Sequence, residues 1–384
     1  MSRRLRLGMV GGGQGAFIGA VHRIAARLDD RYELMAGALS SDPARARDSA
    51  AALHIAPERS YAHWADMAEG EASRPDGVEV VAVVTPNHLH HGPAKTFLQA
   101  GIAVICDKPL CHTLEDALDL AAAAEASAMP FALTHTYSGY PMVRQAREMV
   151  VAGLLGDVRV VQVEYAQQWL ATNLEGTGQK QADWRTDPAR SGAAGAVGDI
   201  GTHALHLAEF VTGLQAESLA ADLSSFVPGR RLDDNAHMLL RFAPRGGVAA
   251  RGMLWCSQVA VGHENGLRLR VAGSAGGLDW AQEQPELLAY TPFGEPARRI
   301  TRGGAGTLPG YGGRVPPGHP EGYLEAFAQL YADFAEQLTA RRDGRAPDPS
   351  SLLVPGIAAG VRGMRFIAAA VASGRADAAW TVIG

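Results

Sequence analysis

The segment from residue 5 to residue 28 constrains the fold more than any other part of the chain. An apolar run at 5–10 is followed by the turn Gly11-Gly12-Gly13-Gln14-Gly15-Ala16 and by a helical pattern at 18–28. Glycines allow a tight turn and close approach of the backbone to a pyrophosphate, and free N–H groups at a helix start favour negative charge. A plain strand-to-helix turn also accepts glycines, but the order of the three elements favours a dinucleotide-binding unit.

Strands and helices alternate through the first third of the chain. Strands are expected at 32–39, 78–84 and 102–106, and helices at 43–53, 93–100 and 114–128. This rhythm predicts a parallel sheet covered by helices on both faces. Thr113, with Asp116 three residues later, resembles a capping box and predicts the start of the last of these helices.

The pattern changes near residue 131. Strands at 158–165, 236–242, 248–257, 267–272 and 278–281 follow one another without helices, which predicts a mostly antiparallel sheet. Segments 301–320 and 341–350 are predicted loops, each leading into a helix, at 323–338 and 352–372. We therefore expect an α/β protein with an N-terminal Rossmann dinucleotide-binding domain, 1–130, and a C-terminal α+β domain with a large open sheet, 131–384.

Composition excludes some classes of function. With 384 residues, 47% of them hydrophobic, the chain can bury a large core, and a net charge of -5 does not favour nucleic acid or an anionic membrane as a partner. The three cysteines, Cys106, Cys111 and Cys256, cannot all pair and do not have zinc-site spacing, which favours a reducing compartment and no metal. The N-terminus runs directly into the first strand, and no apolar stretch reaches membrane-spanning length. We expect a cytoplasmic protein.

Three side chains suggest chemistry on an alcohol. Lys108 follows an apolar strand at the carboxyl edge of the predicted parallel sheet, where such folds bind ligands, and Asp199 and His203 stand four residues apart. Each has a structural alternative: Lys108 as a solvated lysine, Asp199 as a helix N-cap and His203 as a packed histidine. Together they are suited to removing a proton from a hydroxyl group.

Four motifs carry a resemblance to a known family. They are the glycine turn at 11–16, Thr85-Pro86-Asn87-His88-Leu89-His90, Asp107-Lys108-Pro109 and Asp199-Ile200-Gly201-Thr202-His203. In this order and at this spacing they resemble the Gfo/Idh/MocA oxidoreductases, and the similarity extends through 153–156, 184–188 and 273–277 over nearly the whole chain. The resemblance implies an NAD- or NADP-dependent dehydrogenase or reductase acting on a hydroxyl-bearing carbon of a sugar, glycoside or cyclitol such as inositol. It also implies a homo-oligomer, a dimer or tetramer, assembled through the C-terminal sheet.

The resemblance suggests roles for individual residues. His203 is the expected general base and Lys108 the group that stabilises developing alkoxide charge, although the proton acceptor could be Lys108 itself. Asp199 would orient this pair or bind a neighbouring hydroxyl, and no metal is needed because the ammonium group polarises the oxygen. The expected cofactor-binding residues are Gly11, Gly13, Gln14, Gly15, Ala16, Ser40, Ser41, Thr85, Asn87, His90, Asp107 and Lys108. The expected substrate-binding residues are Lys108, His135, Tyr137, Trp184, Arg185, Asp199, His203 and His319.

Some of these residues have simpler explanations, and three departures from the family pattern stand out. The simpler explanation for Asn87 and His90 is that they shape a turn after Pro86. For Trp184 it is packing, and for Arg185 an ordinary surface charge. The first turn has about three residues more than the family pattern, which leaves open which glycines contact phosphate. Asp107 stands where glutamate is commoner, and His206 where aspartate is often found; the latter change bears on substrate contacts.

The end of the second strand bears on the choice of cofactor. An acidic residue there would bind the ribose 2′-hydroxyl and repel a 2′-phosphate, but the position is occupied by Ser40, with Arg45 and Arg47 on the following helix. We therefore expect NADP to be tolerated. If the strand ended later, Asp42 would take over the ribose contact and favour NAD.

One late segment is a further candidate for the substrate pocket. Residues 318–323 contain His319, Glu321 and Tyr323 and follow a long run rich in Gly and Pro. A long loop in a compact domain is usually functional or disordered, and the alternative is a simple helix start with Glu321 favoured by the helix dipole.

Two other functions are compatible with the sequence. A regulator of the same fold would bind the dinucleotide or sugar as a signal but would not need Lys108, Asp199 and His203 together. A glycoside-cleaving enzyme would oxidise its sugar only transiently and release no reduced cofactor.

Overall fold

The structure is a computed structural model that describes residues 3–308, 310 and 313–384. The chain separates into two compact units, one made of residues 1–139 and 324–361 and the other of 140–323 and 362–384. A contiguous split after residue 130 was expected, so the two divisions differ mainly in a C-terminal segment that returns to the first unit. The hydroxyl of Tyr32 donates a hydrogen bond of 2.8 Å to the carbonyl of Tyr331, which shows one of the contacts that hold this segment.

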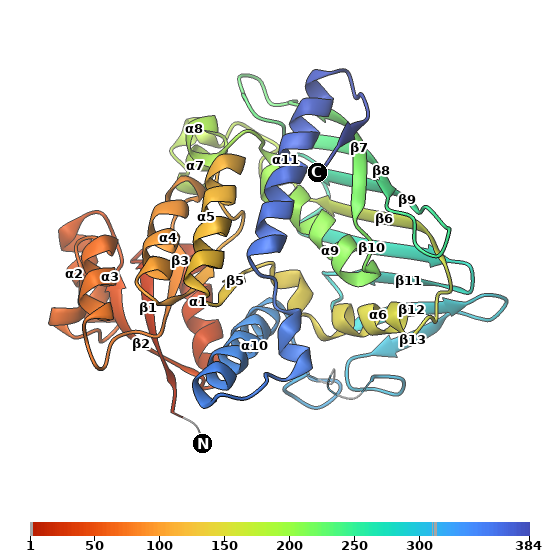
Figure 1. Ribbon diagram of the computed structural model, residues 1–384. Coiled ribbons are helices and arrows are strands. Elements are labelled where there is room, and N and C mark those ends of the chain that lie inside the picture. The colour runs from red at the N-terminus through yellow and green to blue at the C-terminus, as the bar shows by residue number, and fades with distance from the viewer. Residues whose placement is uncertain (1–2, 309, 311–312) are drawn as a thin grey trace. The chain divides into compact units, whose positions relative to one another are not determined.

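The first unit is built on a five-stranded parallel sheet with the order β2-β1-β3-β4-β5 (Figure 1). All residues of β3 and β4 are buried, as expected for strands covered on both faces. Its elements are β1 (Leu5–Gly11), α1 (Phe17–Leu28), β2 (Tyr32–Ala38), α2 (Pro43–Ala52), α3 (Trp64–Ala72), β3 (Val80–Val84), α4 (His91–Gln99), β4 (Ala103–Cys106), α5 (Leu114–Ser127), β5 (Phe131–Leu133) and most of α10 (Tyr323–Asp343).

The second unit contains a nine-stranded sheet with the order β13-β12-β11-β10-β6-β9-β8-β7-β14, in which only the β6–β9 pair is parallel among the described strands. Its strands are β6 (Val158–Ala166), β7 (Ala216–Ser224), β8 (Asn235–Phe242), β9 (Arg251–Ser257), β10 (Gly266–Gly273), β11 (Gly276–Ala281), β12 (Leu287–Pro292), β13 (Arg298–Thr301) and β14 (Thr381–Val382). Its helices are α6 (Pro141–Val151), α7 (Lys180–Arg185), α8 (Pro188–Ser191), α9 (Thr202–Thr212) and most of α11 (Ile357–Arg375). The predicted fold class, a Rossmann domain followed by a domain with a mostly antiparallel open sheet, is therefore confirmed.

Among the described residues of the second unit, helices cover one face of this large sheet. Helices α6, α9 and the second-unit part of α11 lie on the covered face (Figure 1). Along β8 the side chains alternate between buried and exposed, so that Met238 and Leu240 face the helices while His237 and Leu239 face outward. The described helices of the second unit leave the outward face uncovered (Figure 1).

Several predicted element ends are wrong for identifiable reasons. Helix α10 extends to Asp343 instead of ending at 338, because Arg341 and Arg342 favour its C-terminal dipole and Gly344 follows at φ +66°. Helix α11 begins at Ile357 rather than 352, because the residue before Pro355 is held extended. Strand β9 begins at Arg251 rather than 248, because Val248 pairs with Arg245 across the turn at Gly246 and Gly247. The predicted cap of α5 is confirmed, because Thr113 Oγ1 accepts from Asp116 N at 3.1 Å.

One helical segment meets the length and hydropathy criteria for a membrane span. Pro349–Arg375 has 27 residues and a mean hydropathy of 1.4 in its most apolar window, of which 39% is buried. Core helices of soluble proteins meet the same criteria, so this observation is weak evidence for a span. The expectations of a cytoplasmic protein without a membrane partner stay predictions.

Candidate active site

The glycine turn after β1 combines tight packing with an open position. A Cβ on Gly13 would lie 2.7 Å from the carbonyl oxygen of Leu39, so this glycine lets the turn pack against the end of β2. Gly15 has φ +79° and no heavy atom within 4 Å of the position of a Cβ. Only Gly15, of these two, leaves unfilled space next to the start of α1.

The start of α1 is suited to an anion. Its N-cap, Ala16, provides no side-chain hydrogen bond, and no acidic residue occupies the first turn. Backbone N–H groups at such an end have no partner within the helix, and the helix dipole favours negative charge there. The N–H of Gln14 is not available to an anion, because it donates a hydrogen bond to Ser49 Oγ at 3.0 Å. Ala16 N is likewise engaged, because it donates to the carbonyl of Gly13 at 3.1 Å. The turn therefore fits a dinucleotide pyrophosphate, with Gly15 and the first α1 amides best placed to hold it.

Among the residues predicted to contact the ribose after β2, no acidic side chain is left to bind its hydroxyl groups. The strand ends at Ala38, one residue earlier than expected, and Ser40 Oγ accepts from Asp42 N at 3.1 Å. Asp42 is the N-cap of α2, and its Oδ1 accepts from Arg45 N at 2.7 Å. The alternative in which Asp42 binds the ribose required a later strand end, and the structure does not favour it.

Lys108 is the second residue after β4, and the backbone on either side of it is fixed. Asp107 N donates to the carbonyl of Val83 at 3.0 Å. Asp107 Oδ1 accepts from Lys108 N at 3.0 Å and from Thr134 Oγ1 at 2.7 Å. Burial alone would raise the pKa of Asp107, but His22, Lys108 and Thr134 hold this pKa well below its usual range. The shorter carboxylate found in place of glutamate thus stays ionised and holds the Lys108 turn.

His90 joins two of the sequence motifs. Its Nδ1 lies 2.8 Å from the carbonyl oxygen of Pro109, and its Nε2 lies 2.8 Å from that of Thr85. The side chain is buried, and burial lowers the pKa of His90 although Asp107 acts in the opposite direction. Both ring nitrogens face backbone groups, which favours a role in positioning the loop over direct contact with a cofactor. Asn87, in the single turn Asn87–Leu89, is also buried.

Two predicted substrate residues follow β5. His135 and Tyr137 are 2% and 5% exposed and lie in or beside the short helical turn Thr136–Gly139. Thr134, immediately before them, is the residue that contacts Asp107, and no sequence motif pointed to it. This segment therefore contributes at least one contact to the Lys108 turn.

In the second unit, Asp199 lies in a single π-helical turn, Val197–Gly201, that continues into α9. The alternative that Asp199 is a helix N-cap is wrong, because the helical backbone already includes residues before it. The turn is anchored by Asp233, whose carboxylate accepts from Gly195 N at 2.7 Å and Val197 N at 2.8 Å. Such turns interrupt the regular ladder and are frequent at functional sites.

Three predicted residues of the second unit form one cluster. Asp199 Oδ2 lies 3.4 Å from Arg185 Nε and accepts from Gln258 Nε2 at 2.9 Å. The Arg185 guanidinium lies 4.3 Å from the centre of the Trp184 ring. Gln258 is 59 residues away from Asp199 and was missed, because nothing in its sequence context distinguishes it. A carboxylate, a guanidinium, an amide and an aromatic plane together are suited to a ligand with several hydroxyl groups.

His203 lies on α9 and is 7% exposed. Its ring centre is 6.2 Å from that of Tyr165 on β6, at an angle of 57°. His206, the departure from the family pattern, stacks on Phe210 at 5.8 Å between ring centres. Burial, with the nearby charge of Arg147, lowers the pKa of His206 to about 3. His206 is therefore neutral near pH 7 and cannot replace the negative charge of an aspartate.

His319 is exposed, whereas Glu321 two residues later is buried. Glu321 Oε1 accepts from Val315 N at 2.8 Å and lies 3.5 Å from Arg302 Nη1. Arg302 also donates to the carbonyl of His319 and pairs with Glu286 at 2.7 Å. Glu321 is thus used to hold the loop together, which leaves His319 as the residue of this segment available to a ligand.

Cys106, Cys111 and Cys256 are all free and buried, and burial raises the pKa of each thiol. Within the described residues, no group of three or more His, Cys, Asp or Glu side chains is arranged to hold a metal ion.

Sequence models of two domain families match the chain. The family described as an oxidoreductase family with an NAD-binding Rossmann fold matches residues 5–135, and the family described as the GFO/IDH/MocA C-terminal domain matches residues 143–279. The two matches correspond to the two sequence regions expected to have different architectures.

Solved structures and a curated relative are similar over most of the chain. An oxidoreductase from Sinorhizobium meliloti is 54% identical, with a TM-score of 0.90 and 99% of each chain covered. An inositol dehydrogenase homolog from Azotobacter vinelandii, complexed with NADH and myo-inositol, is 36% identical, with a TM-score of 0.89 and coverage of 100% of this chain and 98% of that one. A levoglucosan dehydrogenase from Pseudarthrobacter phenanthrenivorans is 26% identical over 74% of this chain and 76% of its own length.

Proposed function

Because this chain belongs to the Gfo/Idh/MocA family of NAD-binding oxidoreductases, we propose that it transfers a hydride between nicotinamide and a hydroxyl-bearing carbon of a sugar, glycoside or cyclitol. The observation that carries this proposal is the turn at Lys108. An ionised, partly buried Asp107 holds the backbone N–H of Lys108 directly after a strand of the Rossmann sheet. Ligands of such sheets bind at the carboxyl ends of the strands.

NAD(P), when bound, supplies the acceptor or donor of the hydride. Gly15 and the amides of the first α1 turn would hold its pyrophosphate, and residues after β2 would lie next to its ribose. Gly11, Gly13, Thr85, Asn87 and His90 shape the loops that surround this position.

The chain itself must accept or deliver the hydroxyl proton. We assign the general base to His203, because an imidazole titrates close to neutral pH and its proton affinity is matched to the task. The Lys108 ammonium would donate a hydrogen bond to the reacting oxygen and stabilise its developing negative charge. The alternative proton acceptor is Lys108 itself.

The cluster of Trp184, Arg185, Asp199 and Gln258 supports the proposed substrate class. A carboxylate and an amide bind hydroxyl groups through directional hydrogen bonds, and an aromatic ring packs against the apolar face of a sugar or cyclitol. The Azotobacter homolog was solved with myo-inositol, which supports a polyol as the ligand of this chain. His135 and Tyr137 are proposed as further substrate contacts from the first unit.

An absorbance assay with a panel of inositols, monosaccharides and glycosides tests this proposal. Absorbance at about 340 nm should rise when NAD and the right polyol are present, because reduced nicotinamide accumulates only in a net dehydrogenation. Dinucleotide binding without turnover would favour the regulator. Release of a sugar fragment without a rise in absorbance would favour the glycoside-cleaving enzyme.

We propose that NADP is tolerated, and expect its kcat/KM to lie within about a thousandfold of that for NAD, a difference of roughly 4 kcal/mol. The reason is that Ser40 lacks the charge that repels a 2′-phosphate and Asp42 is used as a helix cap. Ser40→Asp should reduce NADP use by roughly tenfold or more while NAD use changes little. A wild-type preference for NAD beyond this range would contradict tolerance.

We propose that His319 contributes to substrate selection. His319→Ala should raise KM for the preferred polyol several-fold, or change the preferred polyol, without changing dinucleotide affinity. Glu321→Gln is the contrasting variant, because it should lower Tm by disturbing the buried ion pair with Arg302. An unchanged substrate profile in His319→Ala would show that the segment is only a helix start.

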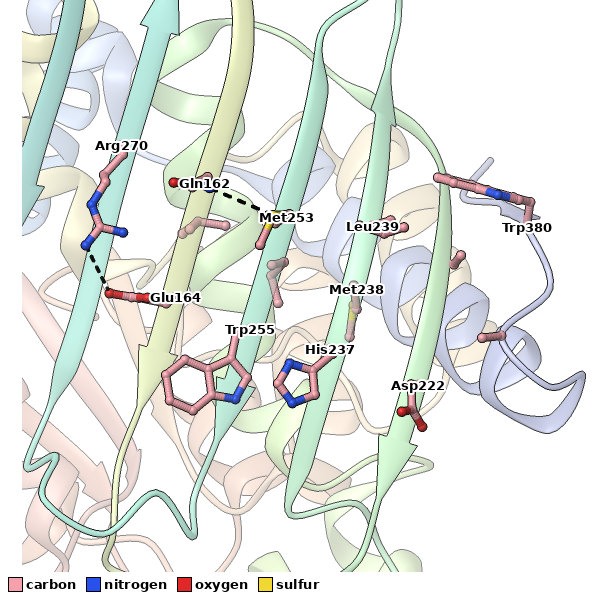
Figure 2. A pocket seen from close by; sticks show the side chains of 14 residues that line it. Gln162, Glu164, Asp222, His237, Met238, Leu239, Met253, Trp255, Arg270 and Trp380 are labelled. Carbon is pink, nitrogen blue, oxygen red and sulfur yellow. Dashed lines mark hydrogen bonds and ion pairs between the residues drawn. The ribbon is translucent and has the colours of Figure 1, made fainter.

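We also propose that a second copy of the chain covers the open face of the large sheet, giving a homodimer or a tetramer. Figure 2 shows the residues that line a groove on this face, with Met253 and Trp255 on β9 next to His237 and Leu239 on β8. Leu239 and Met253 are 53% and 52% exposed, which is unusual for neighbouring apolar side chains on a monomer. Nearby Arg270 and Glu164 lie 3.7 Å apart, so the face offers both charges to an identical partner.

A further inference from the structure

His22 is a buried titratable residue that the proposed mechanism does not use. It lies on α1, and its side chain has 0% exposure. The glycine turn positions α1 closely, because a Cβ on Gly19 would lie 2.4 Å from Gly12 Cα. A buried polar ring destabilises the folded state unless its nitrogen atoms have hydrogen-bond partners.

Helix α10 supplies the first partner of His22. Tyr331 Oη lies 2.8 Å from His22 Nδ1, and the ring of Phe327 packs against the imidazole at 4.7 Å between centres. Burial raises the pKa of Tyr331, and the negative charge of Asp107 acts in the same direction. The phenol is therefore neutral and can donate its proton to Nδ1, which places the ring hydrogen on Nε2.

The second ring nitrogen faces the Lys108 turn. His22 Nε2 lies 4.0 Å from Asp107 Oδ1 and has no hydrogen-bond partner among the described residues. This separation is too long for a direct hydrogen bond, but an N–H directed at a carboxylate still stabilises the negative charge in a site with little water. His22 also contributes to the low pKa of Asp107.

We propose that His22 is a positioning residue for Lys108 and acts through Asp107. Tyr331 fixes the tautomer of His22, Nε2–H orients the Asp107 carboxylate, and Oδ1 of that carboxylate fixes the N–H of Lys108. The inference rests on the proposed function only in assigning Lys108 to the reacting oxygen. The contacts themselves are independent of that assignment, because all four residues belong to the same compact unit. It assigns to α10, more than 300 residues after α1, a part in aligning the reacting group.

Two substitutions of His22 separate the roles of its two nitrogens. The amide of asparagine reaches about as far as Nδ1, so His22→Asn can bind Tyr331 but not Asp107. The longer glutamine reaches about as far as Nε2, so His22→Gln can face Asp107. We expect His22→Asn to lower kcat by roughly tenfold or more with NAD affinity unchanged, because a misplaced reacting group slows the chemical step. We expect His22→Gln to retain most of kcat.

A second measurement needs no turnover. The chain has three lysines, Lys95, Lys108 and Lys180, so acetylation by acetic anhydride can be followed at each by peptide mass spectrometry. The rate at Lys108 relative to the other two should change at least about twofold in His22→Asn and stay close to wild type in His22→Gln. If His22→Asn does not fold, Tyr331→Phe should give a smaller change in the same direction, since it removes only the hydroxyl.

The outcomes separate this inference from the proposed function. Absence of turnover in the wild type would overturn the proposed function, while the acetylation ratios would still test the positioning role. Equal behaviour of His22→Asn and His22→Gln in both kcat and acetylation would overturn the inference. A loss confined to NAD affinity would also overturn it, because His22 would then act on the glycine turn.

Discussion

Lys108→Ala and His203→Ala are each expected to lower kcat by roughly a hundredfold or more, which is the usual contribution of an acid/base group. The dissociation constant for NAD should change by less than about threefold, because these side chains are assigned to the reacting hydroxyl and the pyrophosphate is held by the glycine turn. Steady-state kinetics with a polyol and fluorescence titration with the dinucleotide measure the two quantities.

Lys95→Ala is the matched control for Lys108→Ala. Lys95 is an ordinary surface lysine on α4, paired with Asp119 at 2.7 Å, and its loss should leave kcat unchanged. The double variant Lys108→Ala/His203→Ala should be little worse than the poorer single variant, since residues that act as a unit are not additive. Near wild-type turnover in His203→Ala would show that the assigned base is wrong.

The second large effect is expected on assembly. Leu239→Lys combined with Met253→Lys should raise the dissociation constant of the proposed homo-oligomer by roughly a hundredfold or more, because each copy would bury two unpaired ammonium groups in the interface. Sedimentation velocity over a range of concentrations would show the conversion to monomer.

The control for this pair of substitutions is Phe293→Lys. Phe293 is 84% exposed and follows β12, away from the groove residues, so its change should leave assembly intact. A wild-type protein that is monomeric at micromolar concentrations would contradict the proposal. An oligomer that survives the double substitution would show that copies associate through another surface.

Local signals predicted much of the fold. Alternation of short apolar runs with helical patterns indicated the parallel sheet, and Thr113 indicated the start of α5 because its hydroxyl caps a backbone N–H. Helix α3 was missed, since it begins after His63, whose ring nitrogen replaces the usual capping oxygen. The return of residues 324–361 to the first unit could not be predicted, because it depends on contacts such as Tyr32 to Tyr331 between distant segments.

The candidate-site residues that lie in sequence motifs could be predicted. Asp199 and Arg185 were predicted from different motifs, and the structure brings them to 3.4 Å. Gln258 and Thr134 have no such signal, because a lone amide or hydroxyl after a strand is ordinary in any protein. The partnership of His22 with Tyr331 spans 309 residues and depends on the packing of α10.

Isotope transfer tests the central claim most directly. A polyol substrate carrying deuterium on the carbinol carbon, incubated with NAD and the enzyme, should yield reduced nicotinamide that contains the deuterium, detected by mass spectrometry. Turnover should also be slower than with the unlabelled substrate if hydride transfer limits the rate. Reduced cofactor without deuterium, or product formed with no reduced cofactor released, would contradict the account.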